Sequence, residues 1–68
     1  MKISARNQLA GKIINIKEGA VNAKITLDIG GGKTITSIIT MDSLKDLELM
    51  VSSQATAVIK SSSVMLMV

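Results

Sequence analysis

A chain of 68 residues has room for one small domain, and a domain of this size buries only about 60% of the surface that its unfolded chain exposes. The chain contains no Cys, His, Pro, Phe, Tyr or Trp, which excludes disulfides, zinc sites built on Cys or His, and catalysis that depends on them. A hydrophobic content of 47% is ample for a globular core, and a net charge of +3 is only a mild bias toward anionic partners. We therefore expect one domain over residues 1–68, with self-association as the remaining way to bury more surface.

Neither a membrane span nor a secretory signal is predicted. The longest uninterrupted apolar run is residues 64–68, whereas crossing a bilayer takes about 20 residues. Near the start of the chain, a second cation and two amides occupy the place where a signal peptide carries its apolar stretch. A cytoplasmic protein without a membrane partner is the expectation.

The first half of the chain predicts three strands. Residues 9–17 are rich in Ile and end at Glu18-Gly19, which indicates a strand followed by a turn. Residues 21–29 carry apolar side chains at all five odd positions and polar ones at all four even positions, the period of a half-buried strand. Gly30-Gly31-Gly32 then supplies residues that accept a positive φ before the strand-like run 33–39, so a second hairpin is expected.

A short helix is predicted after the third strand. Thr40 is placed to cap free amides, and Asp42 lies in the positively polarised first turn. Met41, Leu44 and Leu47 recur every three residues, which puts them on one side of a helix.

The end of the chain predicts two more strands, over residues 55–60 and 64–68, separated by a turn at 61–63. The last strand is apolar on both faces, which suggests that another subunit or a second layer covers it. The whole order is that of an all-β fold, a five-stranded OB-type barrel with one short helix between the third and fourth strands. An SH3-like barrel has similar strands and remains an alternative.

Several motifs have plain structural explanations. Gly32-Lys33-Thr34 is similar to the end of a phosphate-binding loop, but Leu27 stands where that loop requires a Gly, and a strand follows instead of a helix. Lys60 and Ser61 are neighbours in a strand and point to opposite faces, so a catalytic nucleophile pair is not predicted. The five acids are spread along the chain, which argues against a metal-cation site, and no enzyme is expected. Single-stranded nucleic acid is bound largely by stacking on aromatic rings, which this chain lacks, so nucleic acid is not an expected partner.

Two segments are rich in hydrogen-bond donors and contain no acid. Residues 4–8 combine a hydroxyl, a guanidinium and two amides, and residues 59–61 add an ammonium and a hydroxyl. A tetrahedral dianion offers only acceptors, so its site is built from backbone N–H, hydroxyl, Arg and Lys groups with carboxylates kept away. These segments are candidates for such a site.

Segments along the whole chain also carry a resemblance to a known family. They are Ser4-Ala5-Arg6-Asn7-Gln8, Gly11-Lys12, Glu18-Gly19-Ala20-Val21, Thr36-Ser37-Ile38-Ile39-Thr40, Asp42-Ser43 and Thr56-Ala57-Val58-Ile59-Lys60. On these residues the chain resembles the molbindin family, the small molybdate-binding Mop domains. The Ser-Ala-Arg-Asn-Gln start combined with the distant Val-Ile-Lys-Ser is the specific part of the match.

The resemblance implies an OB-type barrel assembled into a homohexamer, a trimer of dimers, that holds molybdate or tungstate between subunits for molybdenum storage or homeostasis. The binding residues that it implies are Ser4, Ala5 through its amide, Arg6, Thr40, Ser43, Lys60 and Ser61. Free amides at a helix start favour an anion, which agrees with the positions of Thr40 and Ser43. The resemblance also implies a second kind of site near the threefold axis, around the backbone of residues 19–22, to which no residues are assigned.

An OB-fold interaction module that binds nucleic acid or a protein partner remains the alternative function. The choice between molybdate and tungstate also stays open, because the two anions share charge and nearly the same shape. The sequence departs from the family at Val51-Ser52-Ser53, where relatives carry a charged residue and a Gly. A Ser that replaces Gly in this turn is strained if its φ is positive.

Overall fold

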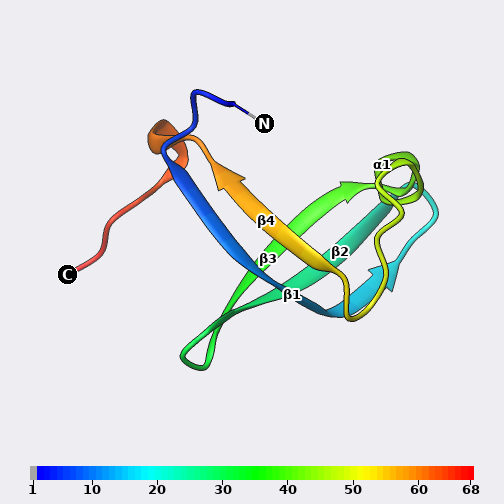
Figure 1. The fold of residues 1–68 in the computed structure, drawn as a ribbon. Coiled ribbons are helices and arrows are strands. Elements are labelled where there is room, and N and C mark those ends of the chain that lie inside the picture. The colour runs from blue at the N-terminus through cyan, green and yellow to red at the C-terminus, as the bar shows by residue number, and fades with distance from the viewer. Residues whose placement is uncertain (1) are drawn as a thin grey trace.

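The computed structural model describes residues 2–68 and consists of one curled antiparallel sheet with a short helix at one end (Figure 1). In chain order the elements are β1 (Asn7–Glu18), β2 (Asn22–Gly30), β3 (Lys33–Thr40), α1 (Met41–Asp46) and β4 (Gln54–Ile59), followed by a 3₁₀ turn over Ser61–Ser63. The strands lie in the order β3-β2-β1-β4, so β1 pairs with β2 on one side and with β4 on the other. A mostly β fold with a short helix between the third and fourth strands is therefore confirmed.

The core follows the predicted alternation in β2. Ala23, Ile25 and Leu27 are buried, and they pack with Ile13 of β1 and Leu44 of α1. A side chain at every second position of a strand faces the same side of the sheet, so these three residues share the concave face. The alternation thus fixes which face of the sheet becomes the core.

The two turns predicted from Gly are hairpins in the structure. Gly30, Gly31 and Gly32 have φ of 96°, 63° and 74°, and the Gly30 N–H donates to a carboxylate oxygen of Asp28 at 2.9 Å. Three consecutive positive φ values exclude most side chains, which explains the Gly triplet as hairpin geometry.

Helix α1 starts as the sequence predicts. The Thr40 hydroxyl accepts a hydrogen bond from the Ser43 N–H at 3.0 Å, and Leu44 is buried under the end of the sheet. After the helix, the backbone is strained at two residues with positive φ, Glu48 at 53° and Ser52 at 83°. The strain expected in this turn is therefore present at Ser52. No helix within residues 2–68 is long and apolar enough to cross a membrane.

The prediction of a fifth strand over residues 64–68 is wrong for the single chain. These residues form no strand, and Met65, Leu66 and Met67 are each more than 90% exposed. Figure 1 shows this segment running away from the sheet after the 3₁₀ turn. The physical reason is that pairing at the edge of its own sheet would bury only one face of this segment, although both faces are apolar. The single chain therefore remains a half-barrel of four strands.

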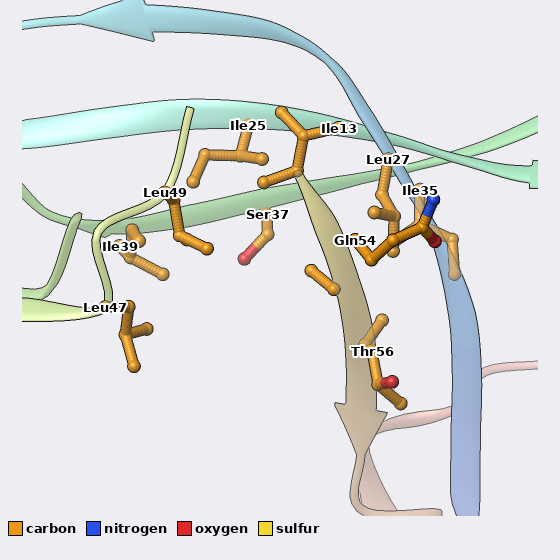
Figure 2. Close-up of a pocket in the computed structure, with 12 residues that line it drawn as sticks. Ile13, Ile25, Leu27, Ile35, Ser37, Ile39, Leu47, Leu49, Gln54 and Thr56 are labelled. Carbon is orange, nitrogen blue, oxygen red and sulfur yellow. The ribbon is translucent and has the colours of Figure 1, made fainter. Parts of the chain in front are cut away.

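The concave side of the half-barrel is an open apolar trough. Its volume is about 380 Å³, and Figure 2 shows its lining side chains pointing inward from the strands and from the segment after α1. The lining includes Ile13, Ile25, Leu27, Ile35, Ile39, Leu49, Ala55 and Ala57. A fifth strand would occupy this side in a closed barrel.

Candidate functional site

A polar cavity lies at the end of the sheet where β1 begins and β4 ends. Its volume is about 250 Å³, and it is lined by Ser4, Ala5, Arg6, Lys60, Ser61 and Ser62. Antiparallel pairing of Asn7 with Ile59 brings the two lining segments together, although more than fifty residues separate them in the chain. The structure thus unites five of the seven residues that the sequence indicates.

The cavity is built from hydrogen-bond donors and positive charge. Arg6 and Lys60 supply two cations, the serines supply hydroxyls, and within residues 2–68 no carboxylate side chain lines it. Glu18, Asp42 and Glu48 lie instead toward the α1 end of the sheet. Charge-assisted bonds from guanidinium, ammonium and hydroxyl groups favour a small anion here.

Ser62 is a lining residue that the sequence alone did not indicate. The sequence predicts a turn over residues 61–63 and assigns a binding role only to Ser61. In the structure these residues form one turn of 3₁₀ helix, in which the Ser63 N–H donates to the Lys60 carbonyl at 2.9 Å. This tight turn folds Ser62 back onto the cavity. The run of three serines after Lys60 was the available signal.

Thr40 and Ser43 lie apart from this cavity. Thr40 ends β3 and pairs with Asn22, so it stands at the α1 end of the sheet, whereas the cavity is at the start of the 12-residue strand β1. The Thr40 hydroxyl also donates to the Ser43 hydroxyl at 2.9 Å, and its oxygen already takes the Ser43 N–H. Within one chain, these two residues do not contribute to the same site as Arg6.

A second hollow lies near the turn that the resemblance associates with a further site. It has a volume of about 300 Å³ and is lined by Lys17, Glu18, Gly19, Asn22, Ala23, Lys24 and Ile38. The Gly19 N–H donates to the Asn22 carbonyl at 2.8 Å, which closes the turn. Two lysines face this hollow together with one carboxylate, so it is a less purely cationic environment than the cavity at Arg6.

The fold and the site together define a small OB-type domain with a donor-lined cavity of a size suited to a small anion. The sequence pattern of the TOBE domain matches residues 3–66. The chain is 51% identical over 67 residues to molybdenum-pterin-binding protein 3 of Clostridium pasteurianum, with 98% of each chain covered.

Solved structures agree with this assignment. The structure of MopII from Clostridium pasteurianum superposes with a TM-score of 0.93 at 48% identity, covering 98% of this chain and 100% of the other. The cytoplasmic molybdate-binding protein ModG, in a form with molybdate bound, superposes with a TM-score of 0.86 at 44% identity, covering 90% of this chain and 43% of the other. The chain therefore belongs to the TOBE domain family, and the resemblance to the small Mop proteins is confirmed.

Proposed function

We propose that this protein binds molybdate or tungstate as the free oxyanion. The anion lies in the cavity formed by Ser4, Ala5 and Arg6 with Lys60 and Ser61. The protein stores or buffers the anion in the cytoplasm and catalyses no reaction. The observation that carries the proposal is the meeting of these two segments in one donor-lined cavity. The ligand named for ModG agrees with it.

The chemistry of the cavity favours a fully ionised tetrahedral anion. Molybdate is a dianion at neutral pH, whereas phosphate is partly protonated and brings an O–H that needs an acceptor. A buried polar group left without a partner costs about 1–3 kcal/mol, which corresponds to about 5- to 150-fold in affinity. Phosphate is therefore disfavoured by its proton, while sulfate, which lacks that proton, is rejected only by size.

The name of the relatives also includes a pterin, which is a flat ring system. Proteins hold such rings largely by stacking on aromatic side chains, and this chain has no Phe, Tyr or Trp. This composition supports the inorganic oxyanion as the ligand.

We also propose that the functional unit is a homo-oligomer, a trimer of dimers. The open trough and the apolar segment 64–68 leave two apolar surfaces uncovered in the single chain, and a second copy supplies cover for both. Thr40 and Ser43 reach an anion at Arg6 only if they come from another copy, because they stand at the other end of the sheet. Self-association would thus complete the site as well as the fold.

Calorimetric titration of the purified protein with molybdate, tungstate, sulfate and phosphate at pH 7 tests the proposed function. We expect molybdate and tungstate to bind. Phosphate should bind at least about fivefold more weakly, since one unsatisfied group alone is worth that factor. Sulfate should bind more weakly because it is smaller. Native mass spectrometry of the same samples measures the oligomer and counts its bound anions. Equal affinity for phosphate and molybdate would refute the donor-only cavity, and a monomer that binds no oxyanion would favour the interaction-module alternative.

A further inference from the structure

Two carboxamide side chains flank the cavity without lining it. Asn7 and Gln8 follow Arg6 directly, and each donates a hydrogen bond to a backbone carbonyl next to the cavity. The Gln8 side-chain nitrogen donates to the Ala5 carbonyl at 3.1 Å, and the Asn7 side-chain nitrogen donates to the Ile59 carbonyl at 3.3 Å. Ala5 lines the cavity and Ile59 precedes Lys60, so both lining segments are held by these bonds.

The two bonds differ in reach and so act on the cavity in different ways. The Gln8 bond spans three residues and sets the shape of the loop that presents Ser4, Ala5 and Arg6. The Asn7 bond spans 52 residues and reinforces the pairing of β1 with β4 at the position where Lys60 leaves the sheet. The Asn7 bond therefore joins the two cationic segments, and the Gln8 bond holds the loop that carries Arg6.

The same bonds also occupy acceptors. A free carbonyl oxygen beside the cavity would repel a dianion, and it would accept the O–H of hydrogen phosphate. A carboxamide N–H that donates to this carbonyl takes one of its two lone pairs, and so weakens it as an acceptor without adding a formal charge. The carbonyls of Ala5 and Ile59 are occupied in this way.

We infer that Asn7 and Gln8 are positioning residues that determine specificity, because they donate to the carbonyls of Ile59 and Ala5 and so weaken these two carbonyls as acceptors for a protonated oxyanion. This inference rests on the proposed function at the same cavity. It assigns the discrimination between molybdate and hydrogen phosphate to residues that do not touch the anion.

The test compares Gln8→Met and Asn7→Leu, which keep side-chain bulk and lose the N–H donors, with the parent. Asn15→Leu is the matched control, because Asn15 is an exposed Asn on the same strand at a distance from the cavity. Calorimetry gives the affinity of each protein for molybdate, sulfate and phosphate at pH 7, and native mass spectrometry establishes that the assembly is unchanged.

We expect Gln8→Met to lower the ratio of molybdate to phosphate affinity by about 5- to 30-fold, since the freed carbonyl then satisfies the phosphate proton. The ratio of molybdate to sulfate affinity should stay within about twofold, because sulfate has no proton to donate. Asn15→Leu should leave both ratios at the parent value.

An equal loss of affinity for all three anions would mean that Asn7 and Gln8 have only a structural role. That result would overturn the inference and leave the proposed function standing. A parent protein that binds none of the anions would refute both. If Asn7→Leu fails to fold, Gln8→Met decides alone, because Gln8 is exposed and its bond is local.

Discussion

Arg6 is the residue whose loss should weaken oxyanion binding most. It is one of two cations in the cavity, and its planar guanidinium can donate two parallel bonds to one anion, whereas Lys60 is a flexible point charge. A hydrogen bond to a charged group is worth about 1.5–3 kcal/mol. Arg6 can donate two such bonds, but it is exposed, so solvent screening makes their combined contribution smaller than the sum of two. Arg6→Ala should therefore cost about 2–4 kcal/mol, or about 30- to 900-fold in affinity for molybdate.

The neighbouring substitutions set the scale for this effect. Lys60→Ala should cost less than Arg6→Ala, and Ser4→Ala and Ser61→Ala about 1 kcal/mol each. Lys33→Ala is the matched control for lost charge, because Lys33 begins β3 next to the Gly hairpin and does not line the cavity.

Titration calorimetry measures these losses, and native mass spectrometry must confirm that each variant keeps the oligomeric state of the parent. The control matters because a site shared between subunits disappears whenever their interface does. If Arg6→Ala keeps its assembly and binds molybdate like the parent, the segment Ser4-Ala5-Arg6 is not the anion site.

Three further predictions concern folding and assembly. Gly11→Ala should destabilise the protein by about 1–3 kcal/mol, because an added Cβ would overlap the Asp28 carbonyl oxygen. Thermal unfolding measures this, and an unchanged midpoint temperature would contradict the close approach. Ser52→Gly should stabilise the protein by about 1 kcal/mol, because Gly adopts the φ of 83° at this position without strain. Urea unfolding measures this change, and a loss of stability would mean that the Ser side chain is needed there. Leu66→Asp should lower the assembled mass in light scattering with little change in circular dichroism, and a mass equal to that of the parent would count against segment 64–68 as an interface.

The parts of the fold that sequence predicted best are those governed by local physics. The alternation along β2 selects Ala23, Ile25 and Leu27 for the core, because a strand turns every second side chain to the same face. The Gly triplet needs positive φ, and Thr40 satisfies an amide at the helix start whatever the rest of the chain does. Each of these features is decided within a few residues.

The features that the sequence left out depend on pairing or on a partner. Residues 64–68 look like a strand by composition, but a strand exists only when an edge and a covering surface are present, and the single chain provides no cover for both faces. The carboxamides of Asn7 and Gln8 were part of a recognisable segment, yet their roles depend on which carbonyls β1 and β4 bring within reach. Register between distant strands is the information that composition and spacing do not carry.

If the proposed function holds, the exposure of the cavity would link anion binding to assembly. Five of its six lining residues are exposed in the single chain, so water screens the attraction of Arg6 and Lys60 for a dianion. A second copy that covers the trough and segment 64–68 would also exclude water from an anion held between the two copies, and the same charges would then bind more strongly. An anion that binds the assembled protein better than the single chain must stabilise the assembly in return. If it binds only the assembly, the gain is about 2.7 kcal/mol per site at a hundredfold excess over Kd. Oxyanion concentration would then set the fraction of protein that is assembled as well as the fraction that is loaded.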